Sequence, residues 1–339
     1  MNYQSYLSQI SRQLLFLTLI VLAAAAPATA QDVDDVIRTE TRLVQLNVGV
    51  VDKQGRPVKS LTRNDFVVYE DGVKQPIQLF EPVDAPFSLV LMLDMSGSTV
   101  NFRQQLKLAS QRFLDALAPD DRVAVIQFNA KVKSLTGFST DRLKAAYAIE
   151  IAEGAGETHF YEALKFALKE LAKEGKRRKA IVVLTDGLDT SMRNSDRNVL
   201  SKAKTDEEAL GLIDPHSSPD LKTVLNAADR QGVTIYPLAL PSGDPKRLPL
   251  PAPHITGIYA AARVRLQSLA DRTGGRLNEI DRLQYMAQLY REVAANLRSL
   301  YTVAYQPQGD RVSGKWHEIK VEVANSDLTA RTKPGYFAR

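Results

Sequence analysis

The chain has 339 residues, of which 44% are hydrophobic and 24% are charged, a composition that excludes an intrinsically disordered protein and suggests two or more domains. There is no cysteine, so disulfides and thiol chemistry are excluded. The formal net charge is only +5, and the one dense basic cluster, Lys173 to Lys179, lies where a solvated turn is expected, so we expect no nucleic-acid partner.

The first 30 residues have the features of an export signal. Arg12 precedes an apolar stretch from Leu14 to Ala26, and Ala28-Thr29-Ala30 follows as an A-x-A cleavage site. The apolar stretch is too short to span a bilayer comfortably. We therefore expect a signal peptide cleaved near Ala30, a periplasmic or secreted protein, and no membrane span after cleavage. An uncleaved N-terminal anchor is the alternative.

Residues 41–84 predict a small antiparallel β segment. Apolar residues alternate with polar ones from Val44 to Val50, which indicates a strand with one buried face. Further strands are expected at Phe66 to Tyr69 and at Pro76 to Phe80, with turns between them. Nothing in this segment has helical periodicity.

Residues 85–300 alternate between apolar strands and amphipathic helices. The strands show no polar alternation, which is typical of parallel strands covered on both faces. A hairpin partner is expected at Val132 to Phe138. This pattern predicts an α/β fold with a doubly wound, mostly parallel sheet. The expected parallel strands are Ser88–Leu93, Val123–Phe128, Ala180–Leu184 and Val233–Leu240, and the expected helices cover about 106–117, 141–152, 159–173, 219–231, 265–273 and 283–299.

Two long stretches of this region are expected to lack regular structure. Residues 189–217 are polar and aperiodic, and residues 241–262 are rich in Pro and Gly. We expect the first to be an insertion or lid.

Residues 301–339 return to a β pattern. Strands are expected at Tyr301 to Tyr305, Glu318 to Val323 and Leu328 to Arg331. Each flanking β segment has one apolar face that needs cover, so we expect residues 301–339 to pack with residues 41–84. The α/β domain would then be inserted into a small β-sandwich.

A carboxylate and two hydroxyls follow the first apolar strand, in the sequence Asp94-Met95-Ser96-Gly97-Ser98. In open α/β sheets, ligands bind beyond the carboxyl ends of such strands. Asp and Ser oxygens suit Mg²⁺, Mn²⁺ or Ca²⁺, and no soft ligand lies nearby. The alternative is a Ser/Gly turn in which Asp94 caps the next helix.

Two further loops strengthen the prediction of a metal site. Thr158 ends a glycine-rich loop before a helix, and Asp186 follows the strand Ala180 to Leu184. If that strand neighbours the first one, both aspartates lie at the same edge of the sheet. One cation could then be surrounded by three hydroxyls, with two carboxylates beside it; the five residues are Asp94, Ser96, Ser98, Thr158 and Asp186.

These five residues resemble the metal-ion-dependent adhesion site of von Willebrand factor A (VWFA) domains, in which D-x-S-x-S is followed by a Thr and then an Asp. The flanks are similar to the bacterial VWFA-related domain family common in Acidobacteria, at Val50 to Val58, Glu70-Asp71-Gly72, Leu269 to Arg276 and Gly335-Tyr336-Phe337. The resemblance covers about residue 41 to the C-terminus, with the VWFA domain itself at residues 85–300.

The resemblance implies binding rather than catalysis. The hydroxyls would ligate Mg²⁺, or Mn²⁺ or Ca²⁺, and the aspartates would act directly or through water. One coordination position would stay open for an Asp or Glu of a partner protein. The expected function is an exported, metal-dependent protein-binding or adhesion module. The sequence leaves open the partner and the oligomeric state.

Three alternatives remain at this point. In a structural or assembly protein, the β-sandwich would make the contacts and the metal site would be vestigial. A phosphatase with Asp94 as nucleophile is disfavoured, because such enzymes want a second Asp where Ser96 stands. A serine hydrolase needs a Gly-x-Ser-x-Gly turn and a histidine, but that turn is absent and the four histidines show no paired spacing. His159, the only histidine near the site, is expected at the rim or at the start of a helix.

Overall fold

The structure is a computed structural model that describes residues 43–175, 177–205, 208, 211–240, 253–280, 285–308 and 313–338. The predicted signal peptide, residues 1–30, and its cleavage site lie outside the described residues. None of the helices in the described ranges is both long enough and apolar enough to cross a bilayer.

The central element is a six-stranded sheet in the order β10-β9-β8-β5-β6-β7. All neighbouring strands are parallel except β7, which is antiparallel to β6. This confirms the predicted doubly wound, mostly parallel sheet. The strands are β5 (Phe87–Asp94), β6 (Arg122–Phe128), β7 (Val132–Ser139), β8 (Arg178–Thr185), β9 (Val233–Ala239) and β10 (Asn278–Glu279).

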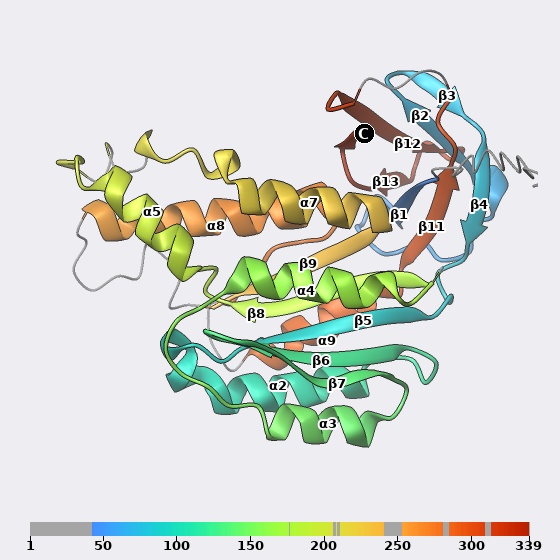
Figure 1. The fold of residues 1–339 in the computed structure, drawn as a ribbon. Coiled ribbons are helices and arrows are strands. Elements are labelled where there is room, and N and C mark those ends of the chain that lie inside the picture. The colour runs from blue at the N-terminus through green and yellow to red at the C-terminus, as the bar shows by residue number, and fades with distance from the viewer. Residues whose placement is uncertain are drawn as a thin grey trace, which may run out of the picture. The chain divides into compact units, whose positions relative to one another are not determined.

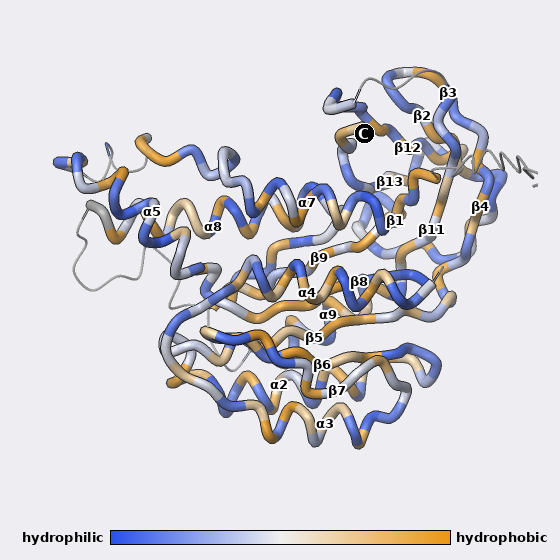
Figure 2. The backbone as a smooth tube through the Cα atoms, in the orientation of Figure 1, coloured by the Kyte–Doolittle hydropathy of each residue, from blue (hydrophilic) through white to orange (hydrophobic). Residues whose placement is uncertain are grey.

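Helices cover both faces of this sheet (Figure 1). Figure 2 shows its strands as largely hydrophobic and its helices as alternating between hydrophobic and hydrophilic residues. On β5, Leu89, Leu91 and Leu93 pack in one layer, whereas Val90 and Met92 pack in the other. The first layer holds α2 (Arg103–Asp115), α3 (Arg142–Glu150) and α9 (Met286–Leu297), and the second holds α4 (Phe160–Ala172), α7 (Pro219–Gln231) and α8 (Pro253–Thr273).

The two stretches expected to lack regular structure are partly helical, so those predictions were wrong. Residues 189–217 contain α5 (Thr190–Leu200) and the short 3-10 helix η3 (Pro215–Ser217). Of the three residues that α5 buries, Thr190, Asp196 and Leu200, two are polar, so its buried face is not marked by apolar residues in the sequence. Helix α8 begins at Pro253 rather than near residue 265, and its first half is built largely from small residues. Residues 241–252 lie outside the described ranges.

The flanking segments form two four-stranded sheets, β13-β1-β11-β4 and β14-β12-β2-β3. Each sheet combines strands from both ends of the chain, since β1 pairs with β11 and β2 pairs with β12. A shared apolar core lies between them, so the predicted β-sandwich is confirmed. The strands are β1 (Val44–Val51), β2 (Phe66–Glu70), β3 (Val73–Gln75), β4 (Ile77–Glu81), β11 (Leu300–Tyr305), β12 (Trp316–Val323), β13 (Thr329–Arg331) and β14 (Gly335–Phe337), with a 3-10 helix η1 (Arg63–Asp65) before β2.

Arg178 holds together the two segments that connect the sandwich strands to the α/β region. Its side chain is fully buried, and its guanidinium lies 4.0 Å from the centre of the Phe87 ring. Burial lowers the pKa of Arg178 to about 10, so the group stays cationic at neutral pH. The guanidinium donates hydrogen bonds to the backbone carbonyls of Pro82, Val83, Ala85, Leu297 and Leu300. One side chain therefore bonds to the backbone before β5 and to the backbone after α9.

Candidate metal centre

Asp94 is the last residue of β5 and is fully buried. One carboxylate oxygen accepts a hydrogen bond from the Ser96 backbone N–H at 3.0 Å, and the other accepts one from the Thr185 hydroxyl at 2.7 Å. Because β5 and β8 are adjacent and parallel, Thr185 ends its strand at the same edge of the sheet. The predicted neighbourhood of the two aspartate-bearing strands is therefore confirmed.

The loop after β5 brings its two serine hydroxyls together. The Oγ atoms of Ser96 and Ser98 lie 3.1 Å apart, at the start of the 3-10 helix η2 (Gly97–Phe102). The Thr99 hydroxyl donates to the carbonyls of Asp94 and Ser96 at 2.8 and 3.0 Å. Arg103 donates to the Ser96 carbonyl from the first turn of α2. These hydrogen bonds fix the backbone of the loop, and the hydroxyls of Ser96 and Ser98 lie next to each other.

Thr158 reaches this edge through a loop that is bonded to both of its neighbours. The Gly97 N–H donates to the Gly156 carbonyl at 3.0 Å, which links it to the serine loop. The Thr158 N–H donates to the Thr190 hydroxyl at 2.9 Å, and the Thr190 N–H donates back to the Thr158 carbonyl at 2.8 Å. A Cβ at Gly154 would lie 2.7 Å from the Met95 carbonyl, so the close approach of the two loops requires glycine.

Asp186 follows β8 directly and is 1% exposed. Its Oδ1 accepts from the Leu188 N–H at 3.1 Å, and the nearby Ser98 hydroxyl acts to lower the pKa of its carboxylate, against the larger effect of burial. Its Oδ2 is buried and has no hydrogen-bond partner among the described residues. Gly187 makes the turn with φ at +83°, a conformation that favours glycine. All five predicted residues are therefore connected at one sheet edge, through contacts of their side chains or of their loops.

The two buried carboxylates disfavour each other's charge. Burial, and then the charge of Asp186, raise the pKa of Asp94 to about 7. Burial raises the pKa of Asp186 as well. A cation between them would remove both penalties and occupy the unpartnered oxygen, and hydroxyl and carboxylate oxygens are ligands that Mg²⁺, Mn²⁺ and Ca²⁺ accept. The residues present therefore fit such an ion. In the described part of the chain, no three His, Asp or Glu residues group together as a metal site.

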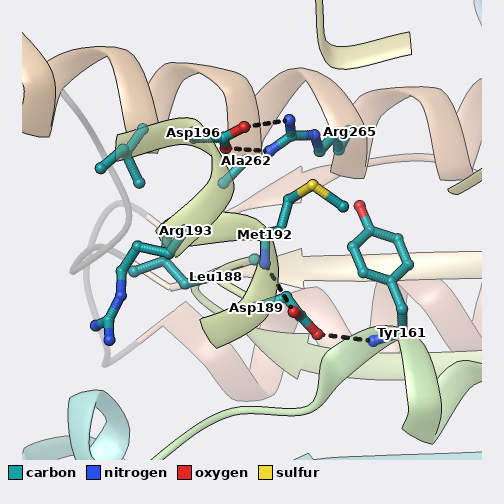
Figure 3. A pocket seen from close by; sticks show the side chains of 10 residues that line it. Tyr161, Leu188, Asp189, Met192, Arg193, Asp196, Ala262 and Arg265 are labelled. Atoms are coloured by element: carbon teal, nitrogen blue, oxygen red, sulfur yellow. Dashed lines mark hydrogen bonds and ion pairs between the residues drawn. The ribbon is translucent and has the colours of Figure 1, made fainter. Parts of the chain in front are cut away.

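Polar contacts of Asp189 and Asp196 tie α5 to α4 and α8, and they were not predicted from the sequence (Figure 3). Asp189 caps α5 by accepting from the N–H groups of Ser191 and Met192, and it also accepts from the Tyr161 N–H in the first turn of α4 at 3.3 Å. Beside it, Arg265 of α8 makes two hydrogen bonds of 2.6 and 2.9 Å to buried Asp196. The hollow between these side chains has ≈ 0 Å³ open to water, so it is packing rather than a ligand site. The sequence does contain one signal for α5. Asp189, followed by Thr190, is a residue type that favours the N-cap of a helix.

His159 lies at the start of α4, as predicted. It is the N-cap residue, and its backbone N–H donates to the Asn129 carbonyl at 2.9 Å. Its ring is 30% exposed and lies 3.7 Å from a Glu157 oxygen and 3.4 Å from a Glu162 oxygen. The imidazole is therefore engaged by carboxylates of its own loop and helix.

Comparisons with known proteins found one curated relative and several solved structures to which the chain is similar. An uncharacterized protein of Synechocystis is 33% identical over 160 residues, which are 44% of this chain and 37% of that protein, so the chain spans well under half of this relative. A von Willebrand factor type A structure from Catenulispora acidiphila covers 82% of this chain and 75% of its own, at 14% identity and a TM-score of 0.48. Proximal thread matrix protein 1 from the mussel byssus, in a structure with a zinc-occupied MIDAS motif, covers 68% of this chain and 50% of its own, at 14% identity and a TM-score of 0.44.

The family comparison covers the part of the chain that holds the candidate metal centre. Residues 89–188 match the model of the von Willebrand factor type A domain. This range begins within β5 and ends after β8, and it includes Asp94, Ser96, Ser98, Thr158 and Asp186. The chain therefore contains a von Willebrand factor type A domain.

Proposed function

We propose that this chain is a divalent-metal-dependent protein-binding module of the adhesion type. Asp94, Ser96, Ser98, Thr158 and Asp186 would hold Mg²⁺, or Mn²⁺ or Ca²⁺, and a partner protein would supply an Asp or Glu. The observation that carries the proposal is the buried, unpartnered Oδ2 of Asp186 beside the buried carboxylate of Asp94. Von Willebrand factor type A domains are generally non-enzymatic interaction modules, which supports binding over catalysis.

The donor set explains why a carboxylate is the expected ligand. Three of the five side chains are neutral hydroxyls, which compensate the charge of a dication poorly. An incoming carboxylate would therefore gain a strong, charge-assisted bond to the ion. Ser98 is exposed at this edge, so a partner side chain can approach the site.

Calorimetric titration of Mg²⁺ and Mn²⁺ into metal-stripped protein tests the site. We expect one saturable site in the wild type and at least about tenfold weaker binding in Asp186→Asn and Thr158→Val, since even outer-shell changes weaken metal sites by about 10–100-fold. Asp115→Asn, at an exposed position on α2, is the matched control and should bind as the wild type does. Equal binding in all four proteins would contradict the proposed site.

The carboxylate requirement is tested by repeating the wild-type titration with acetate present. Acetate should tighten Mg²⁺ binding if the ion keeps a position for a carboxylate. Wild-type protein that binds no metal in either titration would favour the assembly role, in which the sandwich makes the contacts.

We further propose that the protein is exported to the periplasm or beyond. The support is the sequence of residues 1–30, with its apolar stretch and A-x-A site. N-terminal sequencing of the protein recovered from a bacterial periplasmic fraction should read Gln31 as the first residue. An intact N-terminus in a membrane fraction would instead show an uncleaved anchor.

A further inference from the structure

Arg193, in the first turn of α5, lies beside the candidate metal centre. Thr190, the first residue of this helix, exchanges two hydrogen bonds with the backbone of Thr158. Arg193 is three residues further along, and residues three apart share a helix face, about 4.5 Å apart along the axis. After burial, the charge of Asp186 raises the pKa of Tyr259 and the charge of Arg193 lowers it. Asp186 and Arg193 therefore both lie near the same phenol.

The guanidinium of Arg193 has no partner in the described part of the chain. It makes no hydrogen bond or ion pair to a described residue, and Figure 3 shows it pointing away from Asp189 and Asp196. Its Nε is buried, but the two terminal nitrogens are not, so the end of the side chain is accessible to a ligand. Two other arginines of this region are engaged, Arg265 by Asp196 and Arg103 by backbone carbonyls. The positive charge of Arg193 is thus available to a partner.

The loop before α4 has the opposite charge. Glu157 lies next to Thr158, and Glu162 lies in the first turn of α4; the side chains of both are exposed. These carboxylates repel an acidic group that approaches the centre along this loop, whereas Arg193 attracts one that approaches along α5. The distribution of charge therefore favours a partner whose acidic groups lie toward α5.

We propose that Arg193 binds a second acidic residue of the partner protein, next to the one that the metal ion would take. This inference rests on the proposed function and extends it to the sequence of the partner. A guanidinium can hold a carboxylate through two parallel hydrogen bonds. In an extended segment, two acidic residues separated by one residue point to the same side about 7 Å apart, a distance similar to one helical turn of about 5.4 Å. The partner segment is therefore an extended chain with Asp or Glu at alternate positions.

The test is a calorimetric titration of the full chain, saturated with Mg²⁺, with the peptide acetyl-Asp-Gly-Asp-amide. The comparison peptides, acetyl-Asp-Gly-Asn-amide and acetyl-Asn-Gly-Asp-amide, each carry one acid. We expect the wild type to bind the diacid about tenfold more tightly than either, the lower end of what a hydrogen bond to a charged group contributes. In Arg193→Gln this preference should disappear while Mg²⁺ binding is kept. Arg197→Gln removes the same charge from an exposed position one turn further along α5, and it should keep the preference.

Three outcomes would overturn the inference alone: no preference for the diacid in the wild type, the same preference in Arg193→Gln, or equal loss in Arg193→Gln and Arg197→Gln. The last would show only a general attraction to positive charge. In all three, binding of Mg²⁺ and of a single-acid peptide leaves the proposed function standing. A wild type that binds no peptide in Mg²⁺ would overturn both.

Unfolding midpoints and Mg²⁺ titrations check that each variant is folded. If Arg193→Gln is unfolded, Arg193→Lys decides the question, because lysine keeps the charge but not the two parallel hydrogen bonds. A reduced preference in Arg193→Lys would support the inference, and an unchanged one would contradict it.

Discussion

Replacing Arg178 with methionine is expected to lower the free energy of unfolding by at least about 4 kcal/mol, since each buried carbonyl left without a donor costs about 1–3 kcal/mol. Methionine keeps most of the volume and the contact with Phe87 but donates no hydrogen bond. The five carbonyls that Arg178 satisfies belong to both connecting segments, so both lose their anchor. Denaturant unfolding followed by fluorescence of Trp316, the single tryptophan, measures the change.

Arg56→Met is the control for this experiment. Arg56 pairs with Asp52 on the surface, where its side chain is 75% exposed, and exposed pairs contribute about 0–1 kcal/mol. Similar losses in the two variants would contradict the role assigned to Arg178. If the Arg178→Met protein does not fold at all, Arg178→Lys should give a folded protein of intermediate stability, because a lysine can satisfy some of the carbonyls.

Asp94→Asn is expected to stabilise the metal-free protein at neutral pH while it abolishes stabilisation by Mg²⁺. The pKa of Asp94 is raised to about 7 in the folded protein, against an ordinary value of 3.8. The folded state therefore binds more protons than the unfolded state between these values, and Asp94 lowers stability progressively as the pH rises from about 4 to about 7. Asparagine removes this penalty by carrying no charge.

The measurement is the free energy of unfolding of wild type and Asp94→Asn at pH 5 and pH 8, with a chelator and then with Mg²⁺. The stability difference in chelator should grow from pH 5 to pH 8 in favour of the variant, and Mg²⁺ should reverse it by stabilising the wild type alone. Asp115→Asn should follow the wild type throughout. If the variant is less stable than wild type at pH 8 in chelator, the prediction is wrong, because the negative charge of Asp94 then does not destabilise the metal-free folded state.

The sequence predicts the α/β layers well because their periodicity is strong. Helix α7 begins and ends at the predicted residues, 219 and 231, with Ser218 as its cap and Gly232 at its C-terminus. Asp94 and Asp186 could be placed at one edge because each comes at the end of an apolar strand, and the motif resemblance supplied the three hydroxyl residues. Strands β3 and β10 have only three and two residues, so they carry no pattern of their own.

What the sequence could not reveal are features that depend on contacts between distant segments. The sequence shows Arg178 as one more basic residue in the cluster after α4, and only the fold shows it buried among carbonyls from two other segments. The sequence shows Asp189 as a helix cap, yet the carboxylate also accepts a hydrogen bond from Tyr161, which is 28 residues away in the chain. The unpartnered oxygen of Asp186 likewise appears only once the loops are assembled.

The interleaving of the sandwich strands has a consequence for how the protein is made. Strand β1 pairs with β11, and β2 pairs with β12, so neither flanking sheet can form until residues beyond Leu300 have left the ribosome. The strands of the central sheet follow one another without interruption and can assemble first, since domains generally fold as units during synthesis. The nascent chain must then carry the apolar face of β1 unprotected while more than 200 residues are added. Chaperones that hold extended segments would matter most in that interval. A nonsense mutation at Leu300 would leave the α/β elements complete, but β1 and β2 would lack their partner strands β11 and β12 and be prone to aggregation.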